Sequence, residues 1–149
     1  MTRLSLWGLG IATTALMAAF LLAADRPRTE TTPTYTMQTI GWVRKADGKT
    51  TIVVEEKYRP ALLGMDKLSE IWILWWFDRN DTPEKRSILQ VHPRGNPENP
   101  LTGVFATHSP VRPNLIGMTC CKIIAVHDNV IEIESIDAFA DTPVLDIKS

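Results

Sequence analysis

Hydrophobic and polar positions alternate over short stretches of this chain, which is the pattern of strands with one buried face. In residues 130–136, Glu132 and Glu134 alternate with Ile131 and Ile133, so the two glutamates are expected to point outward. Further segments with strand composition lie at 39–44, 50–54, 104–107, 116–127 and 143–147. The alternation therefore predicts a fold made mainly of short strands.

One apolar segment does not alternate. Residues 71–77 form a continuous apolar run that contains three tryptophans. Such a strand is expected to be covered on both faces, here by a barrel interior on one side and by a helix or a partner subunit on the other. The run is too short to span a membrane.

The connections between these segments are short or polar. Asp47-Gly48 is a hairpin signal, and residues 58–65 suit a short helix that starts at Pro60 and ends at Gly64. Residues 79–100 read as a long polar loop. No G-x-G-x-x-G lies between a strand and a helix, which argues against a Rossmann dinucleotide site. We expect an all-β domain, a small β-barrel with one or two short helices.

The amino terminus has the pattern of a targeting segment. Residues 1–24 carry one basic residue, Arg3, and no acidic residue, and residues 4–24 are almost wholly apolar or small. This pattern predicts a cleaved signal peptide or an uncleaved membrane anchor, either of which exports the domain to the periplasm or beyond. A third interpretation starts the protein at Met37 and keeps it in the cytoplasm. Residues 25–36 are rich in Pro and Thr and read as a linker, which leaves 37–149 as the folded domain.

The amino-acid composition limits the kinds of binding site that the chain can form. The chain has 149 residues, with 16 basic and 17 acidic side chains, which argues against a broad basic surface for nucleic acid. Cys120 and Cys121 are adjacent, so they should point to opposite faces of a strand, and buried inert thiols are favoured over a vicinal disulfide. The three histidines lack metal-ligand spacing, and we predict no metal site.

Polar side chains gather where prolines stiffen the chain. Five prolines fall between residues 93 and 113, in a segment that also contains His92, Arg94, His108, Arg112 and Asn114. Rigid loops at a barrel rim are common positions for binding residues. The alternative is that the prolines only cap strand ends and the arginines are solvated.

A family resemblance sharpens this interpretation. Residues 103–110 (GVFATHSP) with 112–117 (RPNLIG) resemble one signature of the TsaA-like family, also called TrmO, and residues 137–148 (DAFADTPVLDIK) resemble a second. Shorter matches at 40–41, 68–72 and 92–95 precede these signatures and also occur in the family's order. The resemblance covers about residues 39–148, and two long signatures in order are far more specific than one short motif.

The resemblance implies a small β-barrel that binds S-adenosyl-L-methionine (SAM) and works as a homodimer. Known members methylate the exocyclic amine of threonylcarbamoyl-adenosine in tRNA. The cofactor contacts implied by position are Phe77, Asp78, His108, Arg112, Asn114, Gly117, Met118, Ile136, Asp137, Ala138 and Phe139. Asp137 or Asp141 is the candidate to receive the proton that the attacking amine releases.

Three departures from the family pattern keep other functions open. His108 stands where the family has Arg, Asp78 where it has His, and Asp141 where it has Gly. A predicted signal peptide also conflicts with a cytoplasmic tRNA substrate. The alternatives are therefore an exported module that binds SAM or a nucleoside-like ligand without transferring methyl, and a structural protein that dimerises through residues 71–77.

Overall fold

The computed structural model describes residues 32–149. Its compact unit runs from Met37 to Ser149. The strands of this unit are β1 (Gly41–Ala46), β2 (Lys49–Val54), β3 (Glu70–Trp76), β4 (Gln90–Val91), β5 (Thr102–Gly103), β6 (Ile116–His127), β7 (Val130–Ile133) and β8 (Pro143–Lys148). Its helical elements are η1 (Glu56–Leu62), η2 (Met65–Lys67), η3 (Asp78–Asn80), α2 (Pro83–Arg86), η4 (Pro93–Gly95) and η5 (Val104–Ala106).

Six of these strands close a barrel in the order β1-β2-β7-β6-β3-β8, with antiparallel pairing throughout. The predicted hairpin between β1 and β2 is confirmed, since Ala46 pairs with Lys49 across the turn at Asp47 and Gly48. The predicted all-β fold, a small barrel with short helices, is confirmed.

The core is the inner face of the barrel. Eight β-branched residues on its strands are fully or almost fully buried, namely Val43, Ile52, Val54, Ile71, Ile73, Ile131, Ile133 and Val144. Because side chains alternate along a strand, the outward position Glu134 is exposed and Glu132 is only half-buried, as predicted. Burial of these aliphatic side chains is the main force that closes the barrel.

The apolar run behaves differently from the prediction on one of its faces. In β3, Ile71, Ile73 and Trp75 face the interior, which confirms one half of the expectation. On the other face Trp72 is 43% exposed, so no element within residues 32–149 fully covers it. The run follows ordinary strand alternation, and its outer positions are apolar without being buried in the single chain.

Other local predictions need correction. Residues 104–107 are expected as a strand, but Val104–Ala106 form the helix η5, because the amide of Thr107 donates to the carbonyl of Val104 rather than to a neighbouring strand. The strand expected over 130–136 ends at Ile133. The helix expected to start at Pro60 is the 3₁₀ helix η1, which starts at Glu56 and includes Pro60. Gly64 does follow this helix, in the left-handed region at φ 86°.

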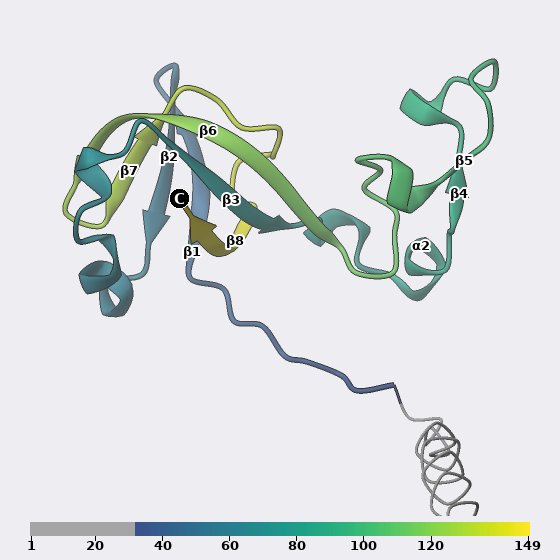
Figure 1. The fold of residues 1–149 in the computed structure, drawn as a ribbon, viewed down its shortest axis with the longest axis horizontal. Coiled ribbons are helices and arrows are strands. Elements are labelled where there is room, and N and C mark those ends of the chain that lie inside the picture. Colours follow the sequence, from purple (N-terminus) through teal and green to yellow (C-terminus); the bar gives the residue numbers. More distant parts are fainter. Residues whose placement is uncertain (1–31) are drawn as a thin grey trace, which may run out of the picture. The chain divides into compact units, whose positions relative to one another are not determined.

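A long excursion separates β3 from β6. We call residues 77–115 the arm; it contains η3, α2, the small β4–β5 sheet, η4 and η5. Figure 1 shows α2, β4 and β5 to one side of the barrel, beyond the ends of β3 and β6. The segment expected as a polar loop, 79–100, therefore contains a helical turn, α2, capped by the hydroxyl of Thr82.

The predicted signal peptide or anchor, residues 1–24, lies outside the described residues and stays a prediction, as does most of the linker. Residues 32–36 are exposed and have no regular secondary structure. No helix within residues 32–149 is long and apolar enough to cross a membrane.

The close approach of β1 to β2 gives a stability prediction. A Cβ at Gly41 would overlap the carbonyl oxygen of Val53, which is main chain and cannot swing away. We expect Gly41→Ala to lower the free energy of unfolding by about 1–3 kcal/mol, as overpacking does. Gly103→Ala is the matched control, because its Cβ would meet only the Leu89 carbonyl at 4.0 Å. Equal denaturant midpoints for the two variants would contradict the prediction.

Candidate functional site

A cavity of about 860 Å³ lies where β3 and β6 meet the arm. Its lining comes from the end of β3 and η3, from the loop after η5, from the start of β6 and from the loop before β8. The lining residues are Trp75, Phe77, Asp78, Arg79, Asn80, Phe105, Thr107, His108, Pro110, Arg112, Asn114, Ile116, Gly117, Met118, Thr119, Asp137, Ala138, Phe139 and Thr142. Segments far apart in the sequence therefore build one site.

The base of the cavity is an indole lying over a glycine. Trp75 is the direct cross-strand partner of Gly117, and a Cβ on that glycine would lie 2.5 Å from Trp75 Cε2. The indole Nε1 donates to the hydroxyl of Thr119 at 3.1 Å. Phe77 packs edge-on against Trp75, with ring centroids 4.5 Å apart. This packing holds the Trp75 ring flat against β6, and a larger residue at position 117 would displace it.

A second aromatic ring borders the cavity from the loop before β8. Phe139 is 65% exposed, although Ala138 beside it is buried. The guanidinium of Arg79, from η3 in the arm, lies over the Phe139 ring at 4.2 Å from its centroid. A cation over a ring face is attracted by the ring quadrupole. The contact links the arm to the loop that carries Asp137.

The loop after η5 is held by its own side chains. The Thr107 hydroxyl accepts from the amide of Ser109, and the Ser109 hydroxyl accepts from the amide of Val111. The Arg112 Nη1 donates to the carbonyl of Thr107 at 3.5 Å. Hydroxyl-to-backbone bonds of this kind replace regular secondary structure in a turn. They fix the backbone that presents His108 and Arg112 to the cavity.

Both signs of charge face the cavity. Asp78 and Asp137 supply carboxylates, and Arg79, Arg112 and His108 supply basic groups. Within residues 32–149, no cluster of three or more His, Cys, Asp or Glu side chains could hold a metal ion. The buried thiol is not part of the site: burial raises the pKa of Cys121 to about 11, whereas Cys120 is exposed on the opposite face of β6.

The structure brings together most of the residues named from the sequence. All of the cofactor contacts implied by the resemblance line the cavity except Ile136, which is 5% exposed and packs in the barrel core. Asp137 lines the cavity as well. Asp141 does not: its carboxylate pairs with Arg44, and its amide donates to the Val43 carbonyl.

Several lining residues were not found from the sequence. Phe105 and Thr107 lie inside the first signature beside His108, and Arg79 and Asn80 directly follow Asp78, so neighbouring positions carried a usable signal. Trp75 and Thr119 gave none, because their meeting depends on the register of β3 against β6. Thr142 is a buried polar residue whose position depends on how β8 closes the barrel.

Comparison with known proteins agrees with this geometry. Residues 32–149 match the sequence model of TrmO_N, the tRNA-methyltransferase O N-terminal domain. The chain belongs to this family. The predicted TsaA-like, or TrmO, membership is thereby confirmed, and the cavity is a feature of a TrmO_N domain.

The relatives of this TrmO_N domain fall into two groups. It is 45% identical over 114 residues to a probable S-adenosyl-L-methionine-binding protein of Methanocaldococcus jannaschii, covering 76% of this chain and 90% of that one. A probable S-adenosyl-L-methionine-binding protein of Pyrococcus horikoshii is 46% identical over 109 residues, covering 73% and 77%. The human tRNA (adenine(37)-N6)-methyltransferase is 42% identical over 88 residues, covering 59% of this chain and 19% of that protein.

Solved structures share the fold. A crystal structure of TrmO superposes with a TM-score of 0.60 at 26% identity, covering 78% of this chain and 57% of that one. TrmO from Pseudomonas aeruginosa superposes with a TM-score of 0.61 at 24% identity, covering 80% and 56%. This TrmO_N domain thus spans a little over half of those chains.

The Trp75–Gly117 pair gives a prediction for the site. Gly117→Ala forces the indole away from β6, because the new Cβ would lie within 2.7 Å of three ring atoms. We expect a changed near-ultraviolet circular dichroism spectrum, since the Trp75–Phe77 contact is altered. The loss in unfolding free energy should be smaller than for Gly41→Ala, because a side chain can move and a main-chain carbonyl cannot. A spectrum identical to that of Gly103→Ala would contradict this.

Proposed function

We propose that this TrmO_N domain binds S-adenosyl-L-methionine in the cavity and transfers its methyl group to an amine, as a methyltransferase of the TrmO type. The observation that carries the proposal is that the two segments resembling the family signatures meet at one cavity, through His108 and Arg112 on one side and residues 137–139 on the other. Relatives named for S-adenosyl-L-methionine binding, matched over most of their length, support the choice of cofactor.

The lining suits the chemical parts of this cofactor. Its volume falls in the range of about 300–1,000 Å³ that is typical of ligand pockets. Phe77 and Phe139 offer aromatic faces to an adenine ring, and Asp78 offers a carboxylate to ribose hydroxyls. Arg112 and His108 offer donors to a carboxylate. The donor set therefore fits a zwitterionic nucleoside with a positive sulfur.

Methyl transfer places simple demands on the protein. Bound S-adenosyl-L-methionine supplies an electrophilic methyl group on a sulfonium. The residues around it must hold an acceptor amine in line and exclude water, which needs no nucleophilic side chain. As the nitrogen–carbon bond forms and the carbon–sulfur bond breaks, the amine loses a proton. We assign Asp137 to receive it, because its carboxylate lines the cavity whereas that of Asp141 is paired with Arg44.

The acceptor that we propose is an adenosine amine in tRNA. The support is the family itself together with relatives named tRNA (adenine(37)-N6)-methyltransferase, of which this chain covers about a fifth. The export predicted from residues 1–24 argues against a tRNA acceptor, because tRNA is cytoplasmic. Cell fractionation with sequencing of the mature amino terminus separates the two: a cytoplasmic protein that starts at Met37 favours tRNA.

A second function is favoured by one observation. The relatives matched over 77–90% of their length are named for S-adenosyl-L-methionine binding, whereas the matched methyltransferases are covered over about a fifth. An exported module that binds SAM, or a nucleoside-like ligand, without transferring methyl fits this division. His108 and Asp78, where the family has Arg and His, change two of the charged groups that line the cavity, and these changes favour this second function.

Calorimetry and a transfer assay test both functions. Titration with S-adenosyl-L-methionine and with its demethylated product should show binding of each to one site per chain. Labelled methyl groups should then appear in a bulk tRNA pool if the domain is a transferase. Binding without transfer selects the second function. No binding to either ligand contradicts the transferase and also a module that binds SAM.

The two aspartates make a matched pair of variants. We expect Asp137→Asn to lower the methyl-transfer rate by about 100-fold or more, because general-base assistance contributes about 10²–10⁴-fold. Asp141→Asn should change it by no more than about twofold, as expected for a surface position. Initial rates with saturating cofactor measure both. A larger loss for Asp141→Asn would reverse the assignment.

We further propose that the domain is a homodimer through the outer face of β3 and β6. The cross-strand pairs on this face are apolar: Trp72 with Cys120, Leu74 with Met118 and Trp76 with Ile116. Trp72 and Met118 are both about half exposed in the single chain. An apolar strip of this kind is a common basis for association.

A charge placed on this face should separate the subunits. We expect the wild-type protein to sediment as a dimer and Trp72→Lys to sediment as a monomer at the same concentration, because a lysine there cannot be desolvated without cost. Leu63→Lys is the control, since Leu63 is 95% exposed and follows η1, outside the strands of the barrel. A monomeric wild type, or a monomeric Leu63→Lys variant, would argue against the proposed interface.

A further inference from the structure

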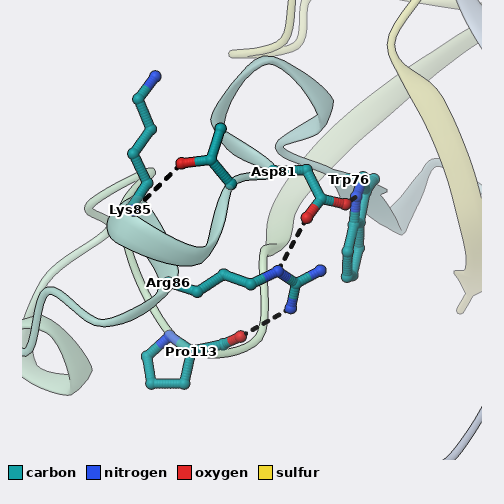
Figure 2. A network of polar contacts seen from close by, with 6 residues as sticks. Trp76, Asp81, Lys85, Arg86 and Pro113 are labelled. Carbon is teal, nitrogen blue, oxygen red and sulfur yellow. Dashed lines mark hydrogen bonds and ion pairs between the residues drawn. The ribbon is translucent and has the colours of Figure 1, made fainter.

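A polar network lies at the base of the arm, where β3 ends and β6 begins. The Trp76 Nε1 donates to one carboxylate oxygen of Asp81 at 3.1 Å, and the Arg86 Nε donates to the other at 2.8 Å. The Arg86 Nη1 donates to the carbonyl of Pro113 at 2.9 Å. Figure 2 shows the Arg86 guanidinium between Asp81 and Pro113, with the Trp76 indole beyond Asp81. The guanidinium also lies 5.2 Å from the centroid of the Trp76 ring.

The network joins both walls of the cavity without lining it. None of its four residues is among the lining residues, yet three of them, Trp76, Asp81 and Pro113, are chain neighbours of lining residues. Trp76 lies between Trp75 and Phe77, Asp81 follows Asn80, and Pro113 lies between Arg112 and Asn114. A guanidinium that bonds to Asp81 and Pro113 together therefore sets the spacing between these two stretches of lining residues.

The helix α2 carries this connection because of its sequence. Thr82 caps its first turn and Pro83 is its first residue, which orients the following Lys85 and Arg86. The Lys85 Nζ donates to the Arg79 carbonyl and to the Asn80 side chain at 3.0 Å. One turn of helix thus bonds back to η3 through Lys85 and across to the other wall through Arg86.

The charges in the network favour its formation at physiological pH. The Arg86 hydrogen bond, with a smaller contribution from Trp76, holds the pKa of Asp81 below its usual value. A carboxyl whose pKa is lowered on folding adds stability above its unfolded pKa and loses it as the pH falls through the folded value. Asp81 is therefore ionised at neutral pH, where it accepts two hydrogen bonds and the ion pair with Arg86 is complete.

We propose that Arg86 is a positioning residue for the cavity: by bridging Asp81 and Pro113 it holds the wall of Phe77–Asn80 at a working distance from the wall of Arg112–Asn114. This inference rests on the proposed function for its ligand, and on the network alone for its structural part. A planar guanidinium is needed because it donates in two fixed directions, which a lysine ammonium does not reproduce. Arg86 acts through the residues that it holds and does not touch the ligand.

The first test is the affinity for S-adenosyl-L-methionine by calorimetry. We expect Arg86→Ala to raise the dissociation constant by about tenfold or more, as the loss of hydrogen bonds to a charged group does. The dissociation constant of Arg86→Lys should lie between those of the wild type and Arg86→Ala, since a lysine keeps the charge and one donor direction. Arg59→Ala is the matched control, because Arg59 forms an ion pair with Glu56 on η1, outside the cavity. Affinities for Arg86→Ala and Arg86→Lys that equal the wild-type value would overturn the proposal.

The second test needs no ligand. Hydrogen exchange by mass spectrometry should show faster exchange in residues 77–82 and 111–116 of ligand-free Arg86→Ala, with unchanged protection in β1, β2 and β7. Asp81→Asn should give the same local pattern, because its side chain can no longer accept from both Trp76 and Arg86. Unchanged exchange at the base of the arm in both variants would overturn the positioning role.

The two tests separate the inference from the proposed function. If wild-type protein does not bind S-adenosyl-L-methionine, the proposed function fails, and the exchange pattern still decides whether Arg86 holds the two walls. If wild type binds and exchange is local in the variants, a weaker affinity in Arg86→Ala confirms that the spacing matters for the ligand. Global loss of protection in Arg86→Ala and Asp81→Asn would instead show a general folding role and contradict the proposal.

Discussion

The pairing of β3 with β6 is the constraint on which the rest of the structure depends. It closes the barrel between strands that are far apart in the sequence, and it also sets where the arm leaves and returns. Within this pairing Trp75 lies directly opposite Gly117, and its indole covers a residue that has no side chain. The same pair is the base of the cavity. Barrel closure and site formation are therefore one packing event.

The arm explains how a barrel of ordinary size presents a large site. A barrel of six strands fills its interior with side chains and leaves no room for a ligand there. The cavity forms instead between one end of the barrel and a segment of the chain that leaves it, with Arg79 over Phe139 connecting the two. Because the cavity lies outside the barrel interior, charged side chains of both signs can line it, which suits a polar ligand.

The structure explains how the fold accepts one departure from the family pattern, the aspartate at position 141. Asp141 replaces a glycine in a turn and lies at φ 67°, a conformation that Asp tolerates better than most residues. Its carboxylate pairs with Arg44 on β1, and its amide bonds to the Val43 carbonyl. The turn is thus kept with a side chain that is outside the cavity. The changes at His108 and Asp78 differ in kind, because both of these side chains line the site.

Much of this protein follows from local sequence. Alternation placed the buried isoleucines of β7 and the outward glutamates, Asp-Gly located the first hairpin, and the signature segments contained most of the residues that line the cavity. Local sequence failed where the outcome depended on a distant partner. Residues 104–107 have strand composition, yet the amide of Thr107 donates to the carbonyl of Val104, and Val104–Ala106 form η5. Trp75 and Thr119 entered the site only through the register of two strands separated by the arm.

The sequence by itself determined the all-β character, the family and the short segments that carry the candidate chemistry, because these are encoded in neighbouring residues. The tertiary structure decided that Asp137 and not Asp141 lines the cavity, that Ile136 belongs to the core, and that Trp76, Asp81, Arg86 and Pro113 form one network. The placement of Asp137, Asp141 and Ile136 depends on how the barrel closes, and the network depends on the contact of Arg86 with Pro113, 27 residues further along the chain. Periodicity and motif spacing report only on local geometry, so they carry no information about contacts between residues that are remote in the chain.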